Sequence, residues 1–198
     1  SKPLIFLNQS CLVNRIHVFN GRNLMSDTLT PILRTNLQQL SISQYPWITK
    51  SKIQLISKLI KAHPAGLRDR SSAVHLSASA FVPVGNAVFF IRHPYLKTIL
   101  LPAGHVEPEE LPLQTAIREF HEETGYQVDS KDEKLIDVNV IEIPANPLKN
   151  EGAHRHIDFR FLLHRNFQKR SGAELPVFQL LYKDAPSEIQ PYYRLIPR

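Results

Sequence analysis

The segment from residue 104 to residue 126, GHVEPEELPLQTAIREFHEETGY, places three glutamates on one side of a single predicted helix. Glu119, Glu122 and Glu123 stand at offsets i, i+3 and i+4, which bring side chains together on one helical face. Two carboxylates about 4 Å apart repel by roughly 4 kcal/mol at an effective dielectric constant near 20. A divalent cation would relieve that repulsion, and an all-oxygen ligand set favours Mg²⁺ or Mn²⁺ over zinc. The alternative is a solvated acidic face without a ligand.

The same helix has a second side that the glutamates leave free. Residues recur there at the 3.6-residue period of a buried stripe, namely Leu113, Ala116, Ile117, Phe120 and Thr124. Pro112 suits the first helical turn, and Gly125 suits the left-handed position that often ends a helix. Upstream, residues 102–104 (Pro-Ala-Gly) form a tight loop that can bring backbone carbonyls close to the same ion. We therefore expect one side of the helix to pack on a core while the other presents carboxylates.

Taken together, this segment resembles the Nudix box of the Nudix hydrolases. The resemblance rests on Gly104, Glu110, Arg118, Glu119, Glu122, Glu123 and Gly125, with apolar residues between them. The chain departs from the usual pattern at Ala103, where the family often has a second glycine. The family uses the backbone carbonyl of that residue, which alanine can also supply.

The resemblance implies a divalent-metal-dependent hydrolase. Such an enzyme cleaves a pyrophosphate bond in a nucleoside diphosphate linked to another moiety, or in a nucleoside triphosphate, by attack of water on phosphorus. Its Mg²⁺ or Mn²⁺ ligands would be Glu119, Glu122, Glu123 and the carbonyl of Ala103. Arg118 is counted with the glutamates among the catalytic residues, although it mostly holds the loop and helix in shape together with Glu110. Gly104 and Gly125 give further structural support.

Three points stay open at the level of sequence. One glutamate of the cluster, or a residue of a later loop, would accept the proton from the attacking water. The substrate is not specified, because Pro144 is displaced from the offset typical of ADP-ribose pyrophosphatases. The alternative function is a Nudix-fold nucleotide-binding regulatory protein without turnover, although such proteins usually show a degraded box.

Residues beyond the box supply further candidates. The family usually adds a carboxylate from a later loop, for which Glu174 and Glu151 are the candidates. His154 and His156 alternate with Asp158 on one face of a predicted strand, and we expect substrate contact or support of the site there rather than zinc binding. The box histidines, His105 and His121, are expected to be exposed.

The expected fold is of the α/β (α+β) class, a Nudix-type α/β/α sandwich with a mixed sheet. We expect an N-terminal extension at 1–24, a helical annex at 25–70 and the Nudix hydrolase domain at 71–198. The annex has two stripes of apolar residues between Thr28 and His63, separated by a Tyr-Pro-Trp break, and reads as a helical hairpin. Strands are predicted at 74–82, 87–91, 98–101, 135–143, 156–164 and 175–182.

Composition limits the partners. Of 198 residues, 42% are hydrophobic without an apolar run near 18 residues, so we expect a soluble chain without membrane contact. The single cysteine, Cys11, fits a reducing compartment and a cytoplasmic location. Residues 1–103 carry a net charge of +10 and residues 104–198 a net charge of −4, which suits a phosphorylated small-molecule substrate or reflects scattered solubilising charge. No nucleic-acid-binding module is recognisable. We expect the hairpin to cover the sheet, and a substrate wall or a homodimer contact are the alternatives.

Overall fold

The computed structural model describes residues 26–94, 97–146, 152–166 and 171–197. The predicted extension at 1–24 and Glu151 lie outside these residues. The α-helices are α1 (Ser26–Ile42), α2 (Lys50–Ala62) and α3 (Pro112–Thr124). Two short 3₁₀ helices follow near the C-terminal end, η2 (Tyr182–Asp184) and η3 (Gln190–Leu195).

The strands form two sheets. The first has the order β5-β1-β7-β6, and its strands are β5 (Ala103–His105), β1 (Val74–Phe81), β7 (His154–Arg165) and β6 (Val128–Ile143). It is mixed, as predicted, because β1 runs parallel to β7 whereas the β1–β5 and β6–β7 pairs are antiparallel. In the second sheet β3 (Ala87–Arg92) pairs with β2 (Pro83–Val84), β4 (Ile99–Leu100) and β8 (Val177–Leu181).

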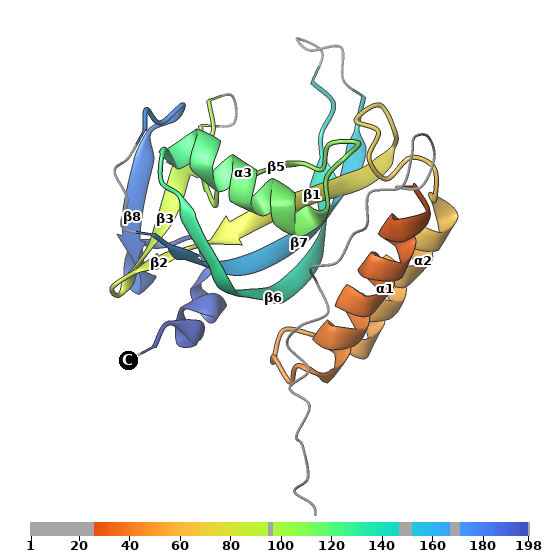
Figure 1. The fold of residues 1–198 in the computed structure, drawn as a ribbon, viewed down its shortest axis with the longest axis horizontal. Helices are drawn as coiled ribbons and strands as arrows, with labels where there is room; N and C mark the ends of the chain where they lie inside the picture. The colour runs from red at the N-terminus through yellow and green to blue at the C-terminus, as the bar shows by residue number, and fades with distance from the viewer. Residues whose placement is uncertain (1–25, 95–96, 147–151, 167–170, 198) are drawn as a thin grey trace, which may run out of the picture.

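Helix α3 lies across one face of the first sheet and packs on β1, β5 and β7 (Figure 1). Its buried side is the predicted stripe, in which Ala116 and Phe120 are completely buried. The Phe120 ring meets the Phe89 ring edge to face, with centroids 5.4 Å apart. The helix begins at Pro112, and the side chain of Gln114 accepts a hydrogen bond from the Leu111 N–H, which caps the first turn. The packed stripe fixes which side of α3 the glutamates present.

The C-terminal end of α3 depends on the conformation of Gly125. This residue has φ = 75° in the left-handed region, and its N–H donates a 2.8 Å hydrogen bond to the His121 carbonyl. A Cβ in this region costs about 1–2 kcal/mol. We therefore expect Gly125→Ala to lower the free energy of unfolding by that amount in urea denaturation. Gly152→Ala, at a glycine with open space around it, is the control, and equal effects of the two changes would contradict the cap.

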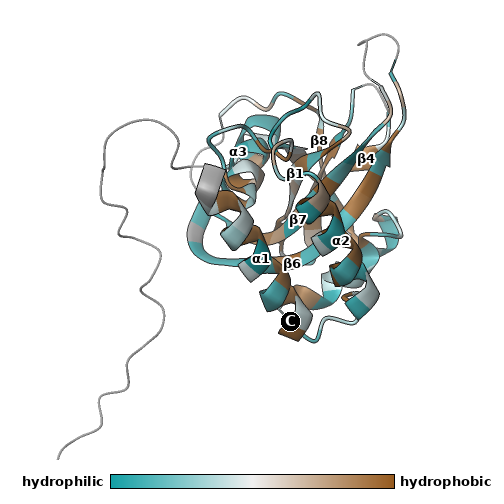
Figure 2. Cartoon of the chain, turned by 90° about the vertical axis from the view of Figure 1, so that its right-hand side faces the viewer, coloured by the Kyte–Doolittle hydropathy of each residue, from teal (hydrophilic) through white to brown (hydrophobic). Residues whose placement is uncertain are grey.

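The predicted helical hairpin is confirmed. Helices α1 and α2 lie side by side beside β6, with hydrophilic and hydrophobic residues mixed along both (Figures 1 and 2). The side chains of Leu33, Leu40 and Ile56 are buried in the same hydrophobic cluster as Phe120. The hairpin therefore shares the core of the sheet, while the boundary between annex and catalytic domain at residue 70 stays a prediction.

Polar contacts fix the hairpin onto β6. The Trp47 indole N–H donates to the Ile136 carbonyl at 2.8 Å, and the Lys52 ammonium lies 2.7 Å from the Asp137 carboxylate. Asp137 is fully buried and also accepts a hydrogen bond of 2.5 Å from the Tyr192 hydroxyl of η3. One buried carboxylate thus joins α2, β6 and η3.

We expect Asp137→Asn to lower the free energy of unfolding by about 1–3 kcal/mol, because an amide cannot replace the charged acceptor of the lysine and tyrosine donors. Urea denaturation followed by circular dichroism measures this change. Asp129→Asn removes an exposed acid from the same strand and is the matched control. If both variants unfold at the same urea concentration, the proposed junction does not contribute to stability.

No helix among the described residues is long and apolar enough to cross a lipid bilayer.

Candidate active site

Arg118 occupies the centre of a group of carboxylates on α3 and its preceding loop. Its Nε and Nη2 donate to the two oxygens of Glu110 at 2.6 and 2.9 Å, a two-point contact that fixes the plane of the guanidinium. Its Nη1 donates to Glu119 Oε1 at 2.6 Å and to Glu122 Oε2 at 3.1 Å. The hydrogen bonds with Glu110 are the main cause of a pKa of Arg118 above its usual value, and the same contact lowers the pKa of Glu110.

The three glutamates have different surroundings. Burial raises the pKa of Glu119 above its usual value, although the hydrogen bond from Arg118 opposes the shift. Burial also raises the pKa of Glu123 to about 8, against the hydrogen bond that the Ala103 N–H donates to it. Glu122 is the most exposed, with 41% of its side chain accessible. Carboxylates offer only oxygen atoms as metal ligands, which suits a hard divalent cation. The charge of such a cation would keep these desolvated carboxylates deprotonated.

Strand β5 brings the backbone of residues 103–105 against these carboxylates. Hydrogen bonds from Ala80 N to Pro102 O and from Val106 N to Leu76 O fix its antiparallel register on β1. In an antiparallel pair only alternate residues direct their N–H and C=O groups at the partner strand, and those of Ala103 point away from β1. Its N–H donates to Glu123 Oε2 at 3.0 Å, so its carbonyl faces the side on which that glutamate lies.

Gly104 is in close contact with Glu119. A Cβ built on Gly104 would lie 1.9 Å from Glu119 Oε1 and 2.1 Å from its carboxyl carbon. A side chain fits here only if the Glu119 carboxylate moves, so glycine is favoured for steric reasons, without a positive φ. The loop can approach the carboxylates this closely only because residue 104 has no side chain.

Residues 74–189, more than half of the chain, match the family model described as the NUDIX domain. The chain belongs to the Nudix family. It is 51% identical over 146 residues to the probable DHNTP pyrophosphohydrolase of Lactococcus lactis subsp. cremoris (strain MG1363), a match that covers 73% of this chain and 87% of that protein. This Nudix hydrolase is accordingly an enzyme that cleaves pyrophosphate bonds, and Nudix hydrolases generally use divalent metals.

Solved structures of Nudix proteins are also similar to this chain. A NUDIX-family hydrolase from Clostridium perfringens matches with 25% identity and a TM-score of 0.42, covering 56% of this chain and 83% of the other. The MutT NUDIX hydrolase of Burkholderia pseudomallei matches with 18% identity and a TM-score of 0.44, covering 59% of this chain and 89% of the other.

Of the two later carboxylates considered for this Nudix hydrolase, only Glu174 is among the described residues. Its backbone N–H donates to the Glu122 carbonyl at 3.2 Å, which anchors the loop before β8 to α3. The negative charge of Glu174 contributes to the raised pKa of Glu123. The structure therefore brings Glu174 towards the cluster, with its side chain exposed.

The two histidines predicted on one strand lie in a different group. His154 and His156 of β7 gather with His75 of β1 and His105 of β5. The expectation that the box histidines are exposed is wrong, because His105 and His121 are both half-buried. Burial lowers the pKa of His105 to about 4. Asp158 lies on the same sheet face but is buried and accepts hydrogen bonds from two serines of β1 at 3.0 and 2.7 Å.

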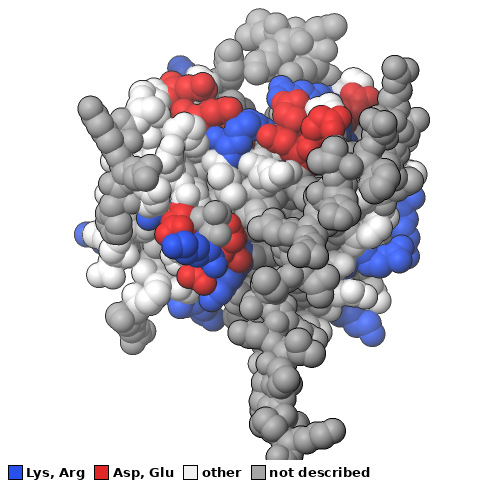
Figure 3. All heavy atoms as spheres, in the orientation of Figure 1, with Lys and Arg blue, Asp and Glu red and all other residues white. Residues whose placement is uncertain are grey.

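Charged residues do not form one continuous basic surface on the described part of the face in Figure 3, where acidic and basic side chains are intermixed. This distribution agrees with scattered solubilising charge, the second of the two interpretations of the uneven sequence charge.

Proposed function

We propose that this Nudix hydrolase releases pyrophosphate from DHNTP (dihydroneopterin triphosphate) in a reaction that depends on Mg²⁺ or Mn²⁺. The carboxylate cluster of α3 around Arg118 is the observation that carries the chemistry, and the 51% identical relative suggests the substrate. Nucleoside triphosphates and nucleoside diphosphates linked to another moiety are the other candidate substrates, since they carry the same kind of pyrophosphate bond.

We assign Glu119, Glu122, Glu123 and the carbonyl of Ala103 as the groups that would hold the cation. When bound, such an ion would polarise phosphate oxygens and lower the pKa of a bound water. The desolvated carboxylates and the direction of the Ala103 carbonyl support this set. One glutamate of the cluster or a residue of a later loop accepts the proton from the attacking water, and no single base is assigned, because coupled carboxylates share their apparent pKa values.

The residues around the three glutamates hold their carboxylates in position. Arg118 holds Glu119 and Glu122 in place through Nη1 while its other nitrogens are fixed by Glu110. A side chain held from two directions loses little entropy when the substrate arrives, and such preorganisation lowers the barrier of phosphoryl transfer. Gly104 leaves the space in which the Glu119 carboxylate lies.

A substrate panel tests the proposal. DHNTP, the common nucleoside triphosphates, ADP-ribose, nucleotide sugars and diadenosine polyphosphates are each incubated with Mg²⁺, with Mn²⁺ or with EDTA. Organic phosphate products are separated by chromatography, and pyrophosphate and orthophosphate are measured separately. We expect the highest kcat/KM for DHNTP, with pyrophosphate as product and no turnover in EDTA. A higher kcat/KM for another substrate would overturn the DHNTP assignment, and tight nucleotide binding without any turnover would favour the regulatory alternative.

We also propose that the protein is cytoplasmic and forms a homodimer through the hairpin of α1 and α2. Light scattering coupled to gel filtration measures the molar mass in solution and so tests the homodimer.

A further inference from the structure

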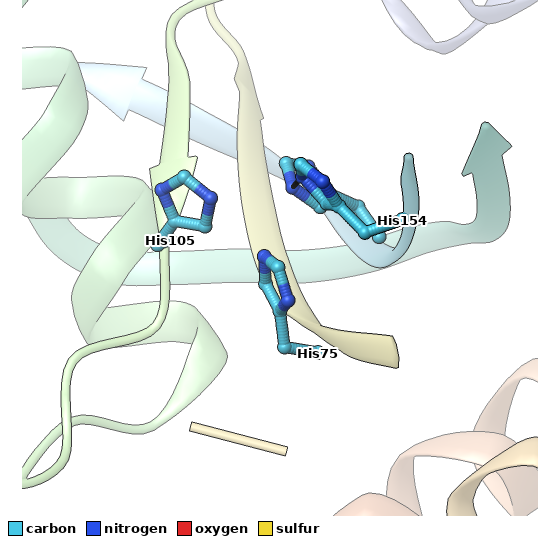
Figure 4. Close-up of side chains that lie close together, drawn as sticks. His75, His105 and His154 are labelled. Carbon is cyan, nitrogen blue, oxygen red and sulfur yellow. Dashed lines mark hydrogen bonds between the residues drawn. The ribbon is translucent and has the colours of Figure 1, made fainter. Parts of the chain in front are cut away.

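Four histidines meet on the first sheet, on the strand face opposite to the side chains that pack under α3. His75 of β1 is paired in register with His156 of β7, and His105 of β5 is paired with Ser77, the next position of β1 on the same face. One ring nitrogen from each of the four histidines lies within 4.8 Å of the others. Figure 4 shows the labelled rings of His75, His105 and His154 around a common space. Three strands that are distant in sequence thus deliver imidazoles to one point.

Backbone carbonyls fix the tautomer of two of these rings. The Nδ1 of His75 lies 2.9 Å from the Ser72 carbonyl, and the Nδ1 of His154 lies 2.8 Å from the Gly152 carbonyl. A carbonyl oxygen only accepts, so both Nδ1 atoms carry the proton and donate it. In a neutral imidazole Nε2 is then left with a free lone pair. Ligand histidines in metal sites are oriented in this way, by a hydrogen bond from the ring nitrogen that does not bind the metal.

Three of the Nε2 atoms, those of His75, His154 and His156, could each bind a shared metal ion. His75 is 1% exposed, and its Nε2 is a buried atom without a hydrogen-bond partner among the described residues. The Nε2 atoms of His154 and His156 lie 3.1 Å apart and share a hydrogen bond, which a metal ion bound to both atoms would replace. Zinc–nitrogen bonds of about 2.0–2.1 Å in a tetrahedron separate two ligand atoms by about 3.3 Å. The observed spacing is close to this value.

The protonation state of the histidine group also suits metal binding. Burial lowers the pKa of His75, and it lowers that of His156 to about 3. These rings are therefore neutral near pH 7, which is the form that binds a metal. Among the described residues the group contains only histidines, and the acid on the same face, Asp158, is already occupied by Ser77 and Ser79.

We propose that His75, His105, His154 and His156 form a four-histidine site for a divalent transition metal ion of the Zn²⁺ class, separate from the carboxylate cluster. Imidazole nitrogens favour zinc, copper or nickel, whereas the all-oxygen cluster favours magnesium or manganese. Four protein ligands leave no open position, so the bound ion is structural.

The position of the site defines its effect. An ion there clamps β5 to β1 and β7, and His105 directly follows Gly104, the residue in contact with Glu119. The metal would therefore stabilise the strand that presents the backbone of residues 103 and 104 to the carboxylates. This inference goes beyond pyrophosphate hydrolysis and does not depend on the identity of the substrate.

Metal binding to the full chain, purified without a polyhistidine tag, tests the proposal. After treatment with a chelator, Zn²⁺ is titrated against a chromophoric competitor, and Co²⁺ is added separately to record its visible spectrum. We expect one Zn²⁺ per chain, the visible bands of tetrahedral Co²⁺, and a higher Tm with Zn²⁺ than without it. If the wild-type chain binds no stoichiometric Zn²⁺ in the presence of excess Mg²⁺, the four-histidine site is refuted.

Variants locate the ion. The double change His154→Ala and His156→Ala is expected to weaken Zn²⁺ binding by at least about 100-fold, because two ligands are lost. His164→Ala, at a half-buried histidine on the same strand but outside the group, is the matched control and should bind Zn²⁺ like the wild type. Glu122→Gln should also keep Zn²⁺ binding unchanged. Loss of Zn²⁺ binding in Glu122→Gln, with retention in the double variant, would place the ion at the carboxylates and overturn the proposal.

Discussion

Replacement of Glu122 by glutamine is expected to lower kcat/KM for pyrophosphate release by at least about 10²-fold while the fold is retained. The change keeps the size of the side chain but removes one negative charge from the proposed ligands of the divalent cation, whose stabilisation of the transition state is worth several kcal/mol. Glu122 is the most accessible of the three glutamates, and its side chain accepts one 3.1 Å hydrogen bond from Arg118 among the described residues, so the fold should tolerate the change. Steady-state kinetics over a range of Mg²⁺ concentrations measures the effect.

Glu109→Gln is the matched control for this experiment. Glu109 is an exposed acid on the loop before α3. Its replacement by glutamine removes the same charge as Glu122→Gln, but from a residue outside the proposed ligands. Its kcat/KM should equal that of the wild type, and circular dichroism should show both variants folded. Undiminished turnover by Glu122→Gln would remove Glu122 from the metal assignment.

Gly104→Ala is expected to lower kcat/KM by about 10²-fold, chiefly through kcat. The new Cβ would lie 1.9 Å from Glu119 Oε1, so the carboxylate must move away from the position in which Arg118 holds it. A displacement of about 1 Å in a catalytic group can cost a factor of 10². The atom that must move is the end of a side chain, so we expect only a small change in Tm.

Gly172→Ala provides the comparison for Gly104→Ala, because a Cβ at Gly172 has no atom within 4 Å. Kinetics and thermal unfolding of the two variants separate a catalytic effect from a general effect of alanine. Wild-type kcat in Gly104→Ala would show that Glu119 needs no fixed position.

The helix of the site was predictable because its signals are local. The buried stripe, Pro112 at the start and Gly125 at the end each depend on neighbouring residues, and the structure has α3 at Pro112–Thr124. Strand β6 was harder: it was expected from Leu135 but begins at Val128. The residues between are mostly charged and show no alternation, and the strand exists there because of its pairing with β7, which includes shifts of register.

The contacts around the box could be inferred only in part. Arg118 and Glu110 were each expected to help hold the loop and helix in shape, but their two-point contact was not predicted from the sequence. The four-histidine group was not foreseen. His154 and His156 stood out as an alternating pair, but His75 joins them only through the parallel pairing of β1 with β7. Single-sequence patterns do not reveal which distant strands are neighbours, and the three-residue strand that carries His105 is too short to give a pattern.

The products formed from DHNTP in ¹⁸O-labelled water, analysed by ³¹P NMR and mass spectrometry, test the central claim most directly. Attack of water on phosphorus at a pyrophosphate bond predicts pyrophosphate and a monophosphate ester in equal amounts, with ¹⁸O in one of the two products and no reaction in EDTA. Release of orthophosphate alone, or the same rate with and without the divalent cation, would contradict the assignment of the α3 carboxylates as a metal-dependent pyrophosphohydrolase site.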